Sequence, residues 1–261
     1  MRNFLIQAYS TYKGLFYWLN WSGYITNVFL RPIVMVIMFS LLGRFALDPE
    51  AARDYALGVT AYSMVFILLG GITQSFTYDR ELGTIQCLFT SPANRLINFL
   101  SRPVFHYPNA LLTFTASMTA AWLIVGIDFG PVNWGGFVTT IIITAAAIAA
   151  FGQFLGIFTI IFRDWQNAFG FSIGILLALT GVIIPISVFP PGIEELCKLL
   201  PLTNGLMGIR EAFNGASLSG ISVNIIREAL TGLVYFIIGF TLFRLFERIA
   251  IRRGTLDIEA F

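Results

Sequence analysis

The sequence predicts an all-α membrane protein that crosses the bilayer about six times, and three observations support this class. Apolar residues make up 57% of the 261 residues and charged residues only 11%, whereas soluble domains carry about 25% charged residues. The apolar residues form long runs without Asp, Glu, Lys or Arg, and about 20 such residues span the hydrocarbon core as a helix. Lys and Arg are unevenly divided between the connections. Lipid is therefore the expected solvent of these runs.

The first 23 residues are expected to form an amphipathic helix at the membrane interface. Leu5, Tyr9, Tyr12, Phe16 and Leu19 recur at spacings of three or four residues, with polar residues among the positions between them. This spacing places the apolar side chains on one face of a helix. A helix of this kind lies in the interface and does not cross the bilayer.

Six runs are expected to cross the bilayer. Four of them contain no charged residue, whereas the last has an uncharged centre only between Glu228 and Arg244. The first contains Arg31 beside Pro32, so this arginine must snorkel to the surface or face protein. Every Asp and Glu is expected at a span end or outside the spans. The expected spans are 24–46, 55–76, 103–127, 134–162, 168–189 and 224–246.

The positive charges predict the orientation of the chain. Six spans place both termini on one side, and Lys and Arg accumulate in short cytoplasmic segments. With the N-terminus inside, eleven of the sixteen Lys and Arg residues are cytoplasmic. The remaining five lie outside and are Arg44, Arg53, Lys198, Arg210 and Arg227. Both termini are therefore expected in the cytoplasm.

The sequence lacks the residue patterns that catalysis or cofactor binding would need. No Gly-x-x-x-x-Gly-Lys-Ser/Thr phosphate loop is present, and neither Lys13 nor Lys198 follows a glycine. His106 is the single histidine and is expected to be packed or interfacial, while Cys87 and Cys197 are too far apart for a metal cluster. We therefore expect no catalytic, cofactor-binding or metal-binding residue. The net charge of +2 indicates no nucleic-acid partner.

Two long connections carry a resemblance to a known family. Residues 78–84 read Tyr-Asp-Arg-Glu-Leu-Gly-Thr, with Ser-Pro at 91–92, and this stretch resembles the loop between spans two and three of ABC-2 type exporter permeases. Residues 184–190 and 200–212, with Ile-Pro, Val-Phe-Pro, Leu-Pro-Leu-Thr and Ile-Arg-Glu-Ala, resemble that family's outer region before its last span. The resemblance covers essentially the whole chain and implies a single ABC-2 type transmembrane domain over 1–261.

The resemblance implies what the protein does and with which partners. Such permeases pair as homodimers, and two copies of a separate nucleotide-binding subunit hold ATP and Mg²⁺ and hydrolyse the ATP. The chain would then be a permease subunit in a bacterial cytoplasmic (inner) membrane and not itself an enzyme. The expected cargo is amphipathic or lipid-linked, as in drug and antibiotic exporters or glycolipid and oligosaccharide exporters. A polysaccharide or teichoic acid exporter is the alternative within the family.

The resemblance also assigns the cytoplasmic stretch 78–102 to coupling with the ATPase. Residues 81–93 would form a short coupling helix seated in a groove of the ATPase. The alternative is that the acidic residues only begin a solvated helix, where the helix dipole favours them. The candidate coupling residues are Glu81, Gly83, Thr84, Ile85, Cys87 and Leu88.

Two further sets of residues follow from the family likeness. Residues 190–223 would form two short re-entrant outer helices, the first after residues 190–192 and the second over 203–214, separated by Pro201. Charged residues there would line an outer gate, and plain solvent exposure is the alternative; they are Glu194, Glu195, Lys198, Arg210 and Glu211. The candidate residues of the substrate path are Arg31, Tyr62, Thr73, Gln74, Phe169 and Phe171.

Two glycine pairs and two rival functions complete the expectations. Gly152 and Gly156, like Gly170 and Gly174, permit close helix packing, within one subunit by default or at a dimer seam.

One rival function is that of an ATP-independent secondary carrier or channel, which would transport under an ion gradient without an ATPase. The other is an intramembrane enzyme acting on lipids, which would need a polar catalytic cluster that the sequence does not show; loss of activity on His106→Ala in a folded protein would support it.

Overall fold

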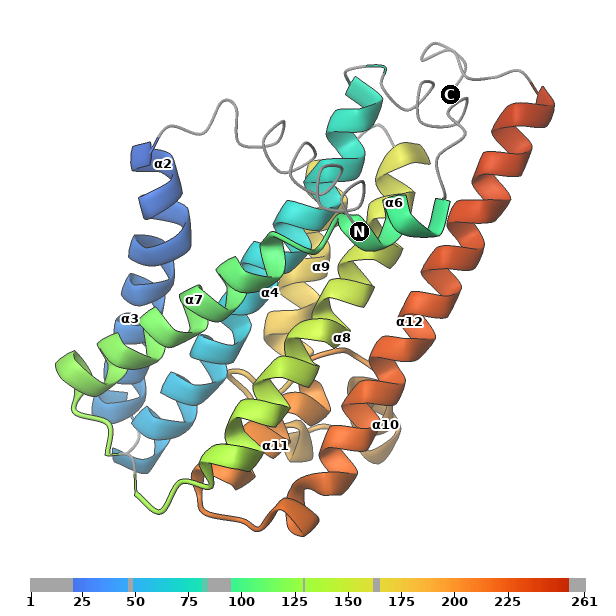
Figure 1. The fold of residues 1–261 in the computed structure, drawn as a ribbon. Helices are drawn as coiled ribbons and strands as arrows, with labels where there is room; N and C mark the ends of the chain where they lie inside the picture. The colour runs from blue at the N-terminus through green and yellow to red at the C-terminus, as the bar shows by residue number, and fades with distance from the viewer. Residues whose placement is uncertain are drawn as a thin grey trace.

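The protein is a helical bundle in the computed structural model, which describes residues 21–46, 49–81, 83, 95–128, 130–161 and 165–253. No β-strand occurs within these ranges. The start of α2 and the end of α12 lie at one end of the bundle, and the short helices α10 and α11 lie at the other (Figure 1). The first elements are α2 (Trp21–Ile25), the π-helix η1 (Thr26–Leu30), α3 (Arg31–Ala46), α4 (Pro49–Glu81), α6 (Arg95–Ser101), α7 (His106–Ala120) and the π-helix η2 (Ala121–Val125). They are followed by α8 (Trp134–Ile161), α9 (Trp165–Leu179), the 3₁₀ turn η3 (Ile186–Val188), α10 (Pro191–Lys198), α11 (Thr203–Phe213) and α12 (Leu218–Arg253).

Five helical stretches in the described ranges are long and apolar enough to cross a membrane. They confirm a multi-pass all-α membrane protein, and they match five of the six expected runs. The expected interfacial helix over residues 1–23 lies mostly outside the described residues, which begin at Trp21. The five stretches are Trp21–Phe45, Ala51–Asp79, Leu96–Val125, Trp134–Phe158 and Leu218–Phe246.

The expected helix over 168–189 is the exception, because α9 ends at Leu179. Its 15 residues cover only about 22 Å at 1.5 Å per residue, less than the hydrocarbon core. The chain turns at Gly181, which has a φ of 82° that favours glycine, and Pro185 lacks the N–H that a helix would need. The non-helical segment that follows packs on α4, where the Val182 carbonyl lies against Gly58. Backbone of this kind is tolerated at membrane depth when protein buries it.

Prolines also shape the first and third expected spans. The first span is continuous from Trp21, but a π-helical turn ends directly before Arg31 and Pro32, because proline cannot donate the backbone hydrogen bond that a regular helix requires. The third was expected over 103–127. The structure instead places a turn at residues 102–105 and starts α7 at His106.

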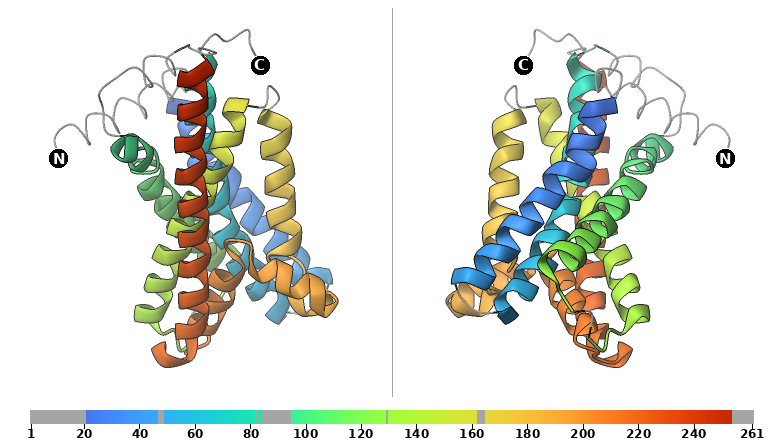
Figure 2. Two further views of the ribbon diagram at one scale, coloured as in Figure 1. Left: turned by 90° about the vertical axis from the view of Figure 1, so that its right-hand side faces the viewer. Right: turned by 90° about the vertical axis from the view of Figure 1, so that its left-hand side faces the viewer.

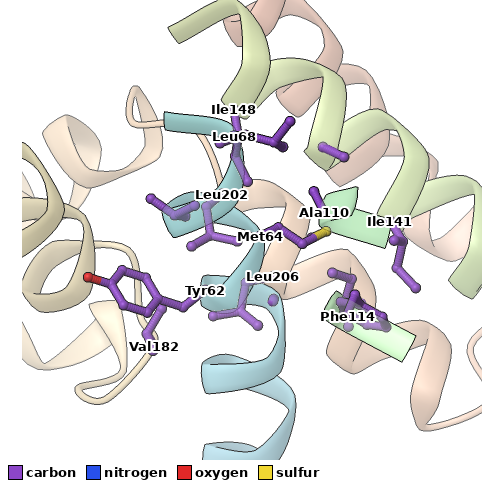
Figure 3. Packing of buried hydrophobic residues seen from close by; sticks show 14 of the residues in the cluster. Tyr62, Met64, Leu68, Ala110, Phe114, Ile141, Ile148, Val182, Leu202 and Leu206 are labelled. Atoms are coloured by element: carbon purple, nitrogen blue, oxygen red, sulfur yellow. The ribbon is translucent and has the colours of Figure 1, made fainter. Parts of the chain in front are cut away.

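The core of the bundle lies where α8 packs between α4 and α12. Side chains of α4, including Met64 and Leu68, meet α7, α8 and the N-terminal part of α11 (Figure 3). A Cβ added to Gly156 of α8 would overlap the ring of Phe76 on α4, and one added to Gly232 of α12 would lie 2.8 Å from the Cα of Ala147. Glycine thus lets these helices approach closely within one chain, as expected for Gly156 of the first glycine pair. A Cβ on Gly152, the other member, would lie 3.4 Å from Ile72, an ordinary contact distance.

The second glycine pair lies on an open face of the bundle. A Cβ built on Gly170 or Gly174 would meet nothing within 4 Å. Helix α9 stands at the edge of the bundle in both views of Figure 2. Among the described residues of one copy of the chain, these glycines therefore serve no close helix contact.

Candidate functional site

A cavity of about 250 Å³ lies between the first membrane helix and helices α4, α7 and α9. It brings together residues that are far apart in the sequence and that come from four different helices. Four of the six predicted path residues line it, namely Arg31, Tyr62, Gln74 and Phe169. The other lining residues are Asn27, Val28, Pro32, Met35, Val59, Ser63, Phe66, Ile67, Gly70, Gly71, His106 and Asn109.

The remaining two predicted path residues do not line this cavity. Thr73 is buried elsewhere on α4, and its hydroxyl donates a hydrogen bond of 2.6 Å to the Leu69 carbonyl. Phe171 points away from the bundle with 71% of its surface exposed. Helical periodicity explains the split, because residues three or four apart share a face of a helix and immediate neighbours do not.

The edge of the cavity carries a positive charge. The guanidinium of Arg31 lies over the ring of Phe66 at 4.3 Å from its centroid and is exposed to the surroundings. Within the described part of the chain, Arg31 forms no ion pair with a carboxylate. A cation–π contact of this kind holds the side chain in place, and it leaves the N–H groups of the guanidinium able to bind an anion or a polar group.

Aromatic rings form the wall between α4 and α9. Tyr62 donates a hydrogen bond of 2.9 Å to the carbonyl of Ile173 on α9, and its ring meets Phe66 edge-to-face at 5.5 Å between centroids. Phe169 adds a third ring from α9 and lies close to Gly70. The wall is therefore apolar on its face, while the Tyr62 hydroxyl is used to tie two helices together.

Polar side chains of α7 that sequence reasoning did not assign to the path also line the cavity. His106 is buried, as the expectation of a packed histidine requires, and it lies so close to Gly71 that a Cβ there would overlap the imidazole. Asn109 accepts a hydrogen bond of 2.9 Å from the hydroxyl of Tyr24. The available signal was the spacing of His106 and Asn109, which lie three residues apart at the start of a span and so share one face of a helix.

The coupling region is only partly described. Glu81 ends α4, and Gly83 has a φ of 67°. The side chain of Glu81 and the candidate residues Thr84, Ile85, Cys87 and Leu88 lie outside the described residues.

A buried ion pair ties together the two ends of this region. The guanidinium of Arg102, only 5% exposed, binds the carboxylate of Asp79 at the end of α4. It also donates to the Ser75 hydroxyl at 3.1 Å and lies over the ring of Phe76 at 3.9 Å. Because residues 80–101 connect the two partners, the pair fixes the base of the segment that was expected to contact an ATPase.

The five charged residues expected at an outer gate fall into two separate groups. On α10, Lys198 pairs with Glu194 at 2.9 Å and with Glu195 at 2.7 Å. The hydrogen bond with Glu195 raises the pKa of Lys198, and the same hydrogen bond lowers the pKa of Glu195. On α11, Arg210 faces Asp54 of α4 at 4.0 Å. The first group is on the surface and the second is packed between helices.

The fifth of these residues, Glu211, accepts a hydrogen bond of 2.8 Å from Asn224 of α12. Helix α11 is thus held to α4 on one side by Arg210 and to α12 on another by Glu211. The two groups of charged residues do not form one ring of charge.

Glu228 corrects the expectation that all acidic residues lie at span ends or outside the spans. It is fully buried within the span Leu218–Phe246. Its carboxylate accepts hydrogen bonds from the backbone N–H groups of Leu202 at 2.7 Å and Gly205 at 2.9 Å. These groups lie at the start of α11, where unpaired N–H groups and the helix dipole favour a negative charge. The chain enters α11 through Leu202, whose φ is 84°.

Multiple membrane-crossing helices around an internal cavity define a multi-pass membrane protein. The model of the ABC-2 type transporter family matches residues 6–214, and the chain belongs to that family. It is therefore a transmembrane permease component of an ABC transporter. No curated protein matches the chain.

Proposed function

We propose that this chain is the permease subunit of an ATP-driven exporter for amphipathic or lipid-linked molecules such as drugs, antibiotics, glycolipids or oligosaccharides. Two copies of the chain would work with two copies of a separate ATPase subunit in a bacterial cytoplasmic membrane, with both termini in the cytoplasm. The observation that carries the proposal is the cavity at Arg31, Tyr62 and Phe169, which joins a cationic edge to an aromatic wall in a family of transporters.

The chemistry of the cavity supports an amphipathic cargo. An anionic or strongly polar head group would meet the Arg31 guanidinium, which no carboxylate of the described residues neutralises. Rings and aliphatic chains of the cargo would lie against Phe66, Tyr62 and Phe169. Aromatic walls bind flat rings and hydrocarbon with little selectivity, so the head group is the part of the cargo that this cavity would select.

Transmission of the ATPase movement would run through the cytoplasmic ends of α4 and α7. The ion pair of Arg102 with Asp79 closes the base of the coupling segment. A force applied to residues 81–93 would then move both helices together. Because α4 also lines the cavity with Tyr62 and Gln74, the same movement would reach the cargo.

Helices α10 and α11 would form the outer part of the path. In the proposed orientation they lie at the outer end of the bundle, and as re-entrant elements they would dip into the outer leaflet. Pro201 separates them, as the sequence indicates. The contacts of α11 with α4 and α12 would let this helix follow their movement and open or close the outer exit.

The experiment that tests the proposal compares two arginines in proteoliposomes that contain the permease and its ATPase. Arg31→Gln should lower transport and cargo-stimulated ATP hydrolysis about tenfold or more for an anionic amphipath, because a hydrogen bond to a charged group contributes about 1.5–3 kcal/mol. Arg244→Gln is the matched control, since Arg244 also lies over a phenylalanine ring, that of Phe240, and lines no part of the cavity.

Three results would contradict the proposal. Equal losses in both variants would show that the cavity has no particular role. Transport by the chain alone under an ion gradient would favour the secondary carrier instead. Loss of a lipid-modifying activity on His106→Ala, in a folded protein, would favour the intramembrane enzyme.

A further inference from the structure

A second cavity, of about 320 Å³, shares no lining residue with the cavity at Arg31. It is formed where α3 ends, α4 begins and the chain leaves η2. Its lining combines two basic side chains, one acidic side chain and glycine-containing backbone. The lining residues are Arg44, Ala52, Arg53, Val125, Gly126, Ile127, Asp128 and Gly130.

The position of this cavity corresponds to the depth of lipid head groups. Three candidate membrane spans end beside it, at Phe45, Ala51 and Val125. Trp122, in the last turn before Val125, exposes 51% of its surface, and Trp134 at the start of α8 exposes 57%. Tryptophan is enriched at the boundary between hydrocarbon and water. The cavity therefore opens at the level of the phosphate groups.

The two arginines are oriented by hydrogen bonds to backbone carbonyls. Arg44 donates a hydrogen bond of 3.3 Å to the carbonyl of Val125, and Arg53 donates one of 3.3 Å to the carbonyl of Phe213. The Arg53 guanidinium also lies over the Phe213 ring at 4.6 Å. In the described ranges, neither arginine forms an ion pair. Each guanidinium has five N–H donors, so both retain donors for a further acceptor.

Asp128 gives the cavity a second chemical preference. Its carboxylate belongs to the same lining as the two guanidinium groups and is exposed. Two cations beside one anion match a ligand that carries a phosphate next to an amine. A purely anionic ligand would meet repulsion from Asp128, and a purely cationic one would meet repulsion from Arg44 and Arg53.

Exposed apolar side chains lie next in the sequence to residues that line this cavity. Phe45 exposes 83% of its surface, Leu123 67% and Ile124 60%. They belong to the ends of the same spans that border the cavity. Hydrocarbon chains attached to a head group in the cavity would lie against these residues.

We propose that this cavity binds the head group of a zwitterionic aminophospholipid of the surrounding bilayer. Arg44 and Arg53 hold the phosphate, Asp128 holds the ammonium group, and the acyl chains follow Phe45 and Leu123. The lipid bridges the end of α3, the start of α4 and the residues that line the cavity after η2, without being transported. This inference does not depend on the cargo or on the direction of transport.

Native mass spectrometry of the purified full-length chain in detergent tests the proposal, with phosphatidylethanolamine and phosphatidylglycerol of matched acyl chains. The wild-type protein should retain phosphatidylethanolamine in preference. Arg44→Gln should weaken its retention about tenfold, because a charge-assisted hydrogen bond is lost. Asp128→Asn should shift the preference toward phosphatidylglycerol. Arg227→Gln, an exposed arginine of α12 outside the cavity, should change neither value.

The outcomes separate the proposal from its alternatives. Equal retention of both lipids by the wild-type and Arg44→Gln proteins would overturn it. Displacement of the bound lipid by soluble phosphoethanolamine at equal concentration would overturn the assignment to a bilayer lipid, because the acyl chains would then contribute nothing. Since Arg53 packs on Phe213 and its replacement endangers folding, Arg44 and Asp128 carry the test, and a monodisperse elution profile confirms that each variant is folded.

Discussion

Replacement of Glu228 should release the start of α11 from α12. Its carboxylate accepts the N–H groups of Leu202 and Gly205 in a fully buried position. In Glu228→Ala both donors lose their acceptor, and each buried unpaired group costs about 1–3 kcal/mol. The local stability of α11 should therefore fall by about 2–6 kcal/mol. In Glu228→Gln one carbonyl oxygen remains, so the loss should be about half as large.

Cysteine modification can measure this loss locally. Leu206 on α11 is fully buried, so a cysteine there reacts only when the helix opens. In a background without Cys87 and Cys197, the modification rate of Leu206→Cys should rise at least about thirtyfold with Glu228→Ala, which corresponds to the lower bound of about 2 kcal/mol. Glu228→Gln should give an intermediate rate.

The control for this experiment is Glu195, which pairs with Lys198 on the exposed face of α10. Glu195→Ala should leave the modification rate unchanged, because exposed ion pairs contribute little. The reasoning would be refuted if Glu228→Ala and Glu195→Ala gave the same rate. It would also be refuted if Glu228→Gln reacted as fast as Glu228→Ala.

Two further substitutions test packing and coupling. Gly156→Val should lower the free energy of unfolding of the solubilised protein by about 1–3 kcal/mol, because the new side chain would overlap Phe76. Gly174→Val should leave this free energy unchanged, because a Cβ there would meet nothing within 4 Å. Equal effects of the two substitutions would contradict the packing. Asp79→Asn should destabilise the protein by about 3 kcal/mol by leaving Arg102 buried without its counter-charge. It should also reduce cargo-stimulated ATP hydrolysis with the partner present, and unaltered stimulation would remove this ion pair from the coupling route.

Much of the helical architecture could be predicted from local sequence. The run 134–162 became α8 almost residue for residue, since it contains no charge and no proline. The two short helices after Pro190 could also be predicted, because proline begins the first and Pro201 precedes the second. The prediction of one helix over 168–189 was wrong at its end, because α9 stops at Leu179 and Gly181 and Pro185 follow, although the run is uncharged.

The candidate site was only half visible in the sequence. Arg31 drew attention because a charge within an apolar run is costly and requires a reason. His106 and Asn109 are neutral and carry no such cost near a span end, so only their spacing of three residues indicated a shared helix face. Glu228 was placed at a span end by its position, but its role depends on the backbone of residues 202–205, which lie more than twenty residues away.

The sequence by itself determined the class of protein. The chain is surrounded by lipid, crosses the membrane repeatedly as helices and belongs to the ABC-2 type transporter family. Those properties follow from runs of residues that each favour hydrocarbon, and such contributions add up along the chain without reference to partners. Only the tertiary structure decided which faces of four helices meet to leave a cavity, and which arginine meets which carboxylate. These depend on contacts between distant segments, and local periodicity gives the face of each helix but not its neighbour.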